Sequence, residues 1–186
     1  MDDMYLTRVL AGDASKYSYF VEKYKDMAFS IAYRIVGSRE DAEEIVQDAF
    51  LNAYRALRTF RRDAKFSTWF YRIVVNRALS KVKRKRAAIA SIEEEISESS
   101  AADVDAAFES LAQAERRAFI SAGLDRLSVD DRLILTVYYL SENSIEEIVE
   151  ITGVSAGNVK MKLHRARKRL YAALHGMLKS ELASII

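Results

Sequence analysis

The sequence contains no cysteine and no proline, and it has only six glycines and two histidines. Without cysteine the chain forms no disulfides and offers no thiolate metal ligands. Two histidines are too few for a zinc site of the usual all-protein kind. The lack of proline means that no helix is interrupted by that residue. Runs of Ala, Leu, Glu, Arg and Lys with few glycines therefore favour an all-α fold.

A long apolar run is also missing, although half of the 186 residues are hydrophobic. No stretch approaches the ~18–20 apolar residues that span a bilayer. The first residues, MDDMYLTRVLAGD, are acidic, whereas a signal peptide begins with a basic segment. We therefore expect a soluble, cytoplasmic protein with enough apolar material for a core.

Catalytic motifs are absent as well. The sequence has no glycine-rich phosphate loop, no Ser-His-Asp arrangement and no cluster of metal-ligating side chains. His164 and His175 lie eleven positions apart with no carboxylate between them. We expect no enzyme activity, no metal, no cofactor and no small-molecule substrate.

The net charge of +2 conceals a strong partition along the chain. Residues 1–90 hold 18 Lys or Arg against 11 Asp or Glu, residues 91–131 hold 3 against 11, and residues 132–186 hold 8 against 5. A basic, acidic, basic order is typical of two nucleic-acid-binding units joined by an acidic connector.

Apolar periodicity and helix-start signals divide the chain in the same way. Ser residues stand three positions before an acidic residue at 38, 128 and 144, as in capping boxes. The pattern predicts two small helical domains, residues 1–86 and 116–186, joined by a flexible linker at 87–115. The helices are expected near 4–11, 14–36, 39–58, 67 to the low 80s, 117–126, 129–140, 144–151 and 156–178.

The stretch SIEEIVEITGVSAGNVKMKLHRARKRL (144–170) predicts a helix-turn-helix. Gly153 stands where the turn needs positive φ, Val154 plugs the turn, and Ser155 caps the second helix. The second helix has one apolar stripe, formed by Val159, Leu163, Ala166 and Leu170.

The other face of that second helix is polar and basic, with six Lys or Arg and no acid between Ser155 and Leu170. A recognition helix needs long donors for base edges and phosphates. An ordinary hairpin with a solvated basic face is the alternative. The residues expected to contact DNA are Ser155, Asn158, Lys160, Met161, His164, Arg165 and Lys168.

Two segments of the first unit carry further signals. In DAEEIVQDAF and its flanks, one helix face combines Glu40, Glu44, Gln47, Asp48 and Leu51 at helical spacing, which suits either a docking surface or a plain solvated face. FSTWFYRIVVNRALSKVKRKR (66–86) joins aromatics to a basic tail, which suits either a buried helix or a surface for unpaired bases.

These segments resemble an extracytoplasmic-function sigma factor of bacterial RNA polymerase. Residues 38–86 are similar to the family's region 2, and LDRLSVDDRLILTVYYLSENSIEEIVEITGVSAGNVKMKLHRARKRL (124–170) is similar to region 4. The two matches occur in the family's order. The resemblance implies a transcription initiation factor whose partners are core polymerase, through its clamp helices and flap, and promoter DNA. It also implies an anti-sigma factor, which is membrane-anchored in many family members.

The resemblance assigns the surfaces as well. The face of Glu40, Glu44, Gln47, Asp48 and Leu51 is implied to dock on the clamp helices, and region 4 is implied to read the −35 element. A base-capturing loop is expected at 85–91. The residues implied to meet the −10 element are Trp69, Tyr71, Arg72, Asn76, Arg77, Lys81, Lys83 and Arg84.

Several alternatives stay open at this point. Trp69 suits the core as well as base stacking, whereas Phe66, Phe70, Ile73 and Val74 are expected in the core. A stand-alone helix-turn-helix regulator would bind duplex DNA tightly without polymerase. A sigma-sequestering antagonist is the third candidate, but the basic face at 159–169 disfavours it, because a DNA mimic should be acidic.

Overall fold

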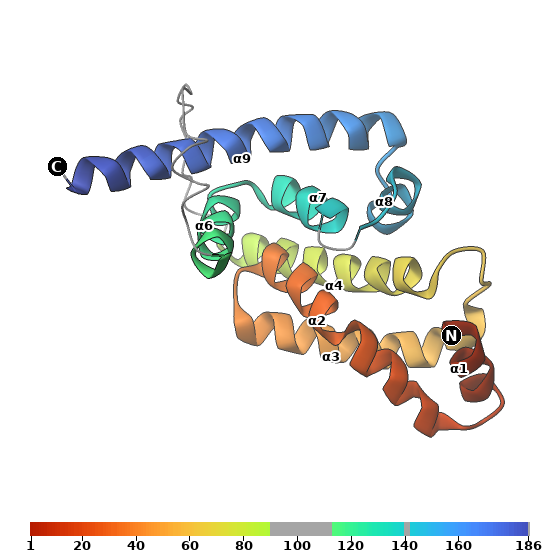
Figure 1. Cartoon of the computed structure of the whole chain (residues 1–186). Coiled ribbons are helices and arrows are strands. Elements are labelled where there is room, and N and C mark those ends of the chain that lie inside the picture. Colours follow the sequence, from red (N-terminus) through yellow and green to blue (C-terminus); the bar gives the residue numbers. More distant parts are fainter. Residues whose placement is uncertain (90–112, 140–141, 186) are drawn as a thin grey trace.

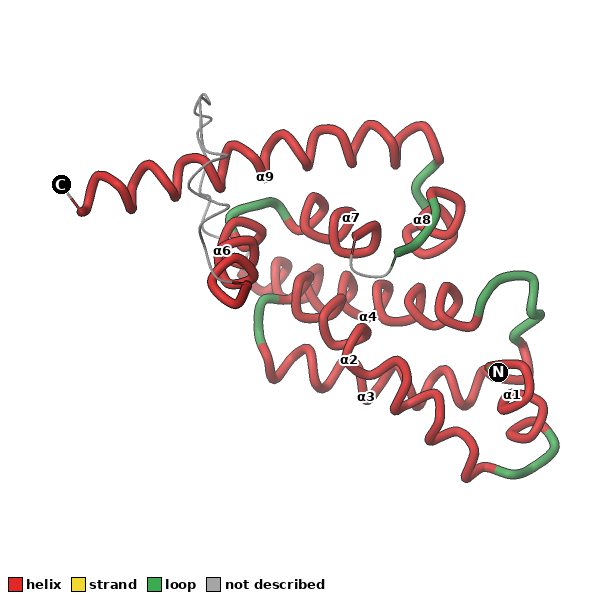
Figure 2. The backbone as a smooth tube through the Cα atoms, viewed as in Figure 1, coloured by secondary structure: helices red, strands yellow, loops and turns green. Residues whose placement is uncertain are grey.

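The computed structural model describes residues 1–89, 113–139 and 142–185, and in these ranges every regular element is a helix (Figure 2). This confirms the expected all-α fold. The elements are α1 (Asp2–Leu10), η1 (Ala14–Tyr17), α2 (Ser18–Val36), α3 (Arg39–Ala56), η2 (Leu57–Thr59), α4 (Phe66–Ile89), α6 (Gln113–Asp125), α7 (Val129–Tyr139), α8 (Ile145–Thr152) and α9 (Ala156–Ile185).

Local side-chain chemistry fixes several helix ends, as the sequence predicts. Ser144 Oγ accepts a hydrogen bond from the Glu147 N–H at 3.2 Å, and the Glu147 carboxylate accepts one from the Ser144 N–H at 2.9 Å. This is a complete capping box at the start of α8. Gly37 ends α2 in the left-handed region, at φ 72°, a conformation that glycine adopts without steric cost.

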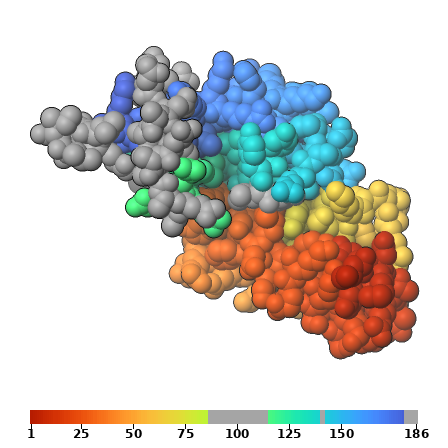
Figure 3. All heavy atoms as spheres, viewed as in Figure 1, coloured from red at the N-terminus to blue at the C-terminus, as the bar shows by residue number. Residues whose placement is uncertain are grey.

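The helices form layers in which α4 is central. Helices α2, α3 and α4 pack against one another, and α1 lies at one end of this group (Figure 1). Helix α7 packs on α2, α8 packs on α4, and α9 covers α7 and α8 on their outer side. The space-filling view shows the C-terminal helices seated directly on the N-terminal ones (Figure 3).

The apolar core is continuous across the two groups of helices. Phe20 and Phe70 from the N-terminal group and Val137 and Ile148 from the C-terminal group are fully buried members of one cluster. Burial of apolar surface is the main favourable contribution to folding. The apolar cluster therefore stabilises the contact between the groups as well as each group itself.

The aromatic run at the start of α4 belongs mainly to this core. Phe66, Phe70 and Val74 are buried as expected, whereas Ile73 is only partly buried. The Phe70 ring lies 4.4 Å from the Phe50 ring, centroid to centroid.

Three helix boundaries differ most from the sequence-based expectation. Helix α4 continues to Ile89, so Lys85 lies in a helix and not in the loop expected at 85–91. An ion pair between Lys85 and Asp41 of α3 holds this last part of α4 against its neighbour. Helix α6 begins at Gln113, inside the expected linker, and α9 runs to Ile185. The remainder of the linker, residues 90–112, lies outside the described residues.

A membrane span needs a long, apolar helix, and none of the helices in the described ranges meets that requirement.

Candidate nucleic-acid interface

Helices α8 and α9 form the helix-turn-helix that the sequence predicts. Gly153 adopts φ 72° at the end of α8, and its N–H donates to the Val149 carbonyl at 2.8 Å. Val154 is partly buried and packs against the core. Val159, Leu163 and Ala166 of α9 are buried, so α9 rests on α7 and α8 along the expected stripe.

The opposite face of α9 is solvent-exposed. All seven residues expected to contact DNA lie on α9 or directly before it and have exposed side chains, and Met161 is 44% exposed. Long donors are thus available along one side of a helix, as groove binding requires. These residues are Ser155, Asn158, Lys160, Met161, His164, Arg165 and Lys168.

The six cations between Ser155 and Leu170 fall into two groups, those with a partner on α7 and those without an ion pair. Lys162 pairs with Asp130 at 2.8 Å, and Arg169 pairs with Asp131 at 2.7 Å. The Arg167 guanidinium lies over the rings of Tyr138 and Tyr139, 5.2 and 5.4 Å from their centroids. Within the described ranges, the three others make no ion pair with a carboxylate; they are Lys160, Arg165 and Lys168.

A second polar and basic surface runs along α4. Arg72, Asn76, Lys83 and Arg84 have exposed side chains there. Arg77 and Lys81 are less exposed because they turn toward α3, where they pair with carboxylates. Helix α4 therefore presents donors for phosphates and bases on the side that the other helices leave uncovered.

Trp69 and Tyr71, two aromatic residues of α4, lie in different surroundings. Trp69 is half-buried, with its ring 5.0 Å from Phe60 and 5.6 Å from Phe66. Tyr71 is 6% exposed, packs edge-on against Tyr24, and burial raises the pKa of its phenol to about 12. In this structure Tyr71 is a core residue, contrary to its expected place at the DNA surface, because α4 is covered on more than one side.

The acidic face of α3 is open to solvent. Glu40, Glu44 and Gln47 are exposed, and Asp48 is partly exposed. Leu51, one turn further, is 55% exposed. The sequence-predicted docking residues therefore share one accessible face, in which an apolar side chain follows polar ones, as at many interfaces.

Glu147 connects the two groups of helices. Besides completing the α8 capping box, its carboxylate pairs with Lys65 at 2.9 Å and accepts a hydrogen bond from the Thr68 hydroxyl at 3.4 Å. Burial alone would raise the pKa of Glu147, but the hydrogen bonds from Lys65 and from the Ser144 N–H hold it below its usual value. At the other end of the contact, Arg34 of α2 pairs with Asp125 at 3.1 Å.

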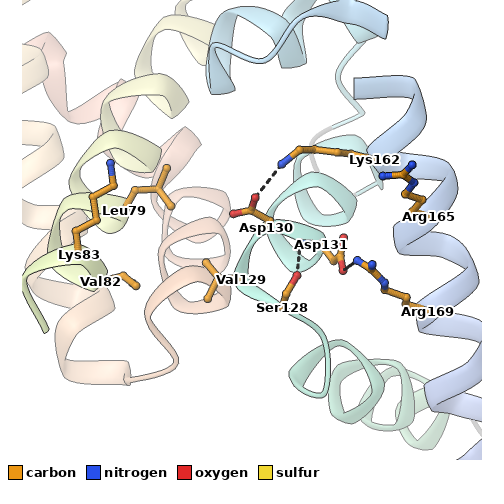
Figure 4. A pocket seen from close by; sticks show the side chains of 10 residues that line it. All are labelled: Leu79, Val82, Lys83, Ser128, Val129, Asp130, Asp131, Lys162, Arg165 and Arg169. Atoms are coloured by element: carbon orange, nitrogen blue, oxygen red, sulfur yellow. Dashed lines mark hydrogen bonds and ion pairs between the residues drawn. The ribbon is translucent and has the colours of Figure 1, made fainter. Parts of the chain in front are cut away.

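A groove of about 490 Å³ lies between α4, α7 and α9 (Figure 4). Its floor includes Leu79, Val82 and Val129, and the Lys162–Asp130 pair crosses one side. Lys83 and Arg165, which belong to the two candidate DNA surfaces, both line it. The groove therefore marks where these two surfaces come together.

The described residues were expected to hold no metal-binding group, and the positions of the potential metal ligands among them are as follows. Among them, no three His, Cys, Asp or Glu side chains are grouped so that they could hold a metal ion. His175 is 2% exposed and contacts the ring of Tyr171, whereas His164 lies on the exposed face of α9.

Sequence reasoning missed one residue that is central to this geometry. Asp41 of α3 contacts both Lys81 and Lys85 of α4. Its position three residues after Ser38 indicated only a helix cap. A four-residue spacing of the two lysines was the available signal, but the partner helix could not be identified from it.

Two stretches of this chain match regions of the Sigma-70 family, and together they cover most of the chain. Residues 20–88 match Sigma-70 region 2, and residues 120–170 match Sigma-70, region 4. The chain is 30% identical over 179 residues to the ECF RNA polymerase sigma factor SigW of Bacillus subtilis (strain 168), with 92% of this chain and 96% of the relative covered. It is 32% identical over 176 residues to the ECF RNA polymerase sigma-E factor of Escherichia coli (strain K12), covering 91% and 92%.

Solved structures share the fold. CnrH in complex with the cytosolic domain of CnrY superimposes with a TM-score of 0.64 at 20% identity, covering 92% of this chain and 95% of that one. The sigma factor RpoE in complex with the anti-sigma factor NepR from Bartonella quintana gives 0.60 at 21% identity, covering 83% and 96%. At these identities the likeness concerns the arrangement of helices.

Proposed function

Because this chain belongs to the sigma-70 family and is an extracytoplasmic-function (ECF) sigma factor of RNA polymerase, it directs promoter-specific transcription initiation, and we propose which surfaces do so. Residues 1–86 act as region 2 and residues 116–186 as region 4, with 87–115 as the connector. The protein itself catalyses no bond formation, since phosphodiester chemistry belongs to the polymerase.

The −35 element is read by the exposed face of α9. This assignment rests on how the cations of α9 are paired: Lys162, Arg167 and Arg169 contact side chains of α7, whereas Lys160 and Arg165 are exposed and make no ion pair with a carboxylate in the described ranges. Ser155 and Asn158 stand at the start of α9, where N–H groups favour phosphate. Met161, His164 and Lys168 complete this surface.

The −10 element is held by the uncovered side of α4. Arg72, Asn76, Lys83 and Arg84 supply exposed donors, and Arg77 and Lys81 stand beside them. Trp69 is half-buried and lines a groove together with Arg72. Tyr71 is left out of this surface because its side chain is buried.

Core polymerase docks on the face of α3. Glu40, Glu44, Gln47 and Asp48 offer carboxylates and an amide to the basic clamp helices, and Leu51 adds an apolar contact.

Region 4 contacts the polymerase flap. An anti-sigma factor is a further partner, as the named complexes of the structural relatives suggest, and the cytoplasm is where all these partners are available.

The docking surface can be tested by removing its charges without changing its shape. The double variant Glu44→Gln/Asp48→Asn should bind purified core polymerase about tenfold more weakly, because charge-assisted contacts at the interface are lost. Fluorescence anisotropy of labelled factor titrated with core enzyme measures the dissociation constant.

Glu43→Gln is the matched control for this experiment. Glu43 is exposed on the same helix but is not one of the proposed docking residues, and it pairs with Arg39 at 2.9 Å. Its affinity for core should change by less than twofold. Equal losses for both variants would show that total charge, and not this face, determines docking.

A further inference from the structure

Three cations of α4 are paired with three carboxylates of α3 along the line where the two helices meet. Arg77 pairs with Asp48 at 3.3 Å, and Lys81 pairs with Glu44 at 2.7 Å and with Asp41 at 3.2 Å. Lys85 also pairs with Asp41. The residues are spaced by three or four on both helices, so the contacts form a row of ion pairs along the seam.

The row joins the two surfaces that the proposed function assigns to different partners. Glu44 and Asp48 belong to the docking face for core polymerase, whereas Arg77 and Lys81 belong to the surface for −10 DNA. The side chains proposed for the two partners are therefore already in contact with each other.

Asp41 differs from the other two carboxylates in its accessibility. Its side chain is 14% exposed, while those of Glu44 and Asp48 are 63% and 48% exposed. Asp41 is also fixed at its backbone, since its N–H donates to Ser38 Oγ at 3.3 Å. A partner approaching from solvent can therefore reach Glu44 and Asp48 but not Asp41.

The direction of the Asp41 side chain supports a role as an anchor. In a complete capping box the carboxylate at this position would return to the N–H of Ser38. Here it contacts Lys85 and Lys81 instead, and the Ser38 hydroxyl donates to Glu40 at 2.9 Å. Hydrogen bonds from Lys85 and Lys81 hold the pKa of Asp41 below its ordinary value, which fits the contacts of this carboxylate with both lysines.

We propose that Glu44 and Asp48 are shared carboxylates: core polymerase competes with Lys81 and Arg77 for them. Docking then frees Arg77 and removes one of the two carboxylate partners of Lys81, so both cations can turn to −10 DNA while Asp41 and Lys85 keep α4 in place. This inference rests on the proposed docking and DNA surfaces. Exchange is feasible because solvent-exposed ion pairs contribute little to stability. Linkage requires that the coupling be reciprocal, so DNA binding strengthens docking as much as docking strengthens DNA binding.

The proposal predicts a gain of affinity from the loss of a cation. Lys81→Met removes the competitor of Glu44 and should tighten binding to purified core polymerase about threefold in the absence of DNA, the size expected for one exposed ion pair. Lys83→Met removes the same charge from the same turn of α4, but Lys83 pairs with no α3 carboxylate in the described structure, so its effect should stay below 1.5-fold. Thermal unfolding of each variant verifies that it is folded.

A double-mutant cycle with Glu44→Gln separates this proposal from the docking assignment on which it rests. If the proposal holds, Glu44→Gln weakens core binding and Lys81→Met no longer tightens it in that background. If Glu44→Gln weakens binding but Lys81→Met leaves it unchanged or weaker, docking stands and the sharing is refuted. If Glu44→Gln has no effect, both are refuted. A gain that persists in the Glu44→Gln background would also refute the sharing, because it would reflect net charge alone.

Discussion

Replacing Lys160 and Arg165 together with alanine should lower transcription from a cognate promoter by roughly 100-fold, because each good contact with a base edge contributes about 1–3 kcal/mol. Both side chains are exposed on α9 and make no ion pair with a carboxylate in the described structure. The measurement is run-off transcription with purified core polymerase at fixed salt, since affinity for DNA depends strongly on salt. Core binding should remain unchanged.

Lys162→Ala/Arg167→Ala is the control for this variant. It removes two charges from the same stretch of α9, but Lys162 is paired with Asp130 and Arg167 lies on the rings of Tyr138 and Tyr139. Transcription should fall only a few-fold, because the loss of two positive charges weakens the non-specific electrostatic attraction between α9 and DNA. If the two double variants lose activity equally, α9 contributes charge but does not read bases.

The second large effect concerns the packed arrangement of the two units. The −10 and −35 elements are about 25 base pairs apart, which is ~85 Å at ~3.4 Å per base pair. In the structure α8 packs directly on α4, and Glu147 contacts Lys65 and Thr68. A protein in this arrangement cannot reach both elements at once, so we expect the units to separate when the polymerase–factor complex binds a promoter.

Energy transfer between two labels measures this separation, and the absence of native cysteine makes labelling specific. Asp63 and Glu150 are exposed and line one groove between the units, so labels at Asp63→Cys and Glu150→Cys lie close together. Transfer should be high in the free factor and almost lost in the promoter complex. A pair within the first unit, Glu22→Cys and Asp63→Cys, should not change. High transfer between the units in an active promoter complex would contradict the expectation.

Much of the helix-turn-helix could be predicted from sequence because its determinants are local. Ser144 and Glu147 form a cap across three residues, and Gly153 supplies positive φ at one position. The buried stripe of α9 follows a single period because α9 is covered on one side only. Its exposed face could therefore be assigned by elimination.

Helix α4 was harder to predict because it lies in the middle of the molecule. Three helices, α2, α3 and α8, pack on it, so its buried arc is wide and includes Tyr71 as well as Phe70. The resemblance to sigma region 2 implies a place for Tyr71 at the DNA surface, and the sequence of α4 alone does not show which helices cover that side chain. The helix also extends to Ile89, where Asp41 holds Lys85, and such a partner on another helix leaves no trace in local periodicity.

The contacts between the two units could not be predicted from the sequence either, because the residues that make them lie far apart along the chain. Thr68 and Glu147 are 79 positions apart, and neither has a spacing that indicates the other. Glu147 was predicted only as a cap, which it is. The contacts of Glu147 with Lys65 and Thr68 depend on how α8 packs on α4, and the continuous apolar core determines that packing.

Run-off transcription on a library of genomic fragments, with and without purified core polymerase, tests the central claim most directly. We predict that factor plus core enzyme yields discrete transcripts from a small set of fragments, which share two sequence elements about 25 base pairs apart, roughly 85 Å along the duplex. The factor alone should bind the same duplexes weakly. Tight, specific duplex binding by the factor alone, with no transcript when core polymerase is added, would contradict initiation and support a stand-alone regulator.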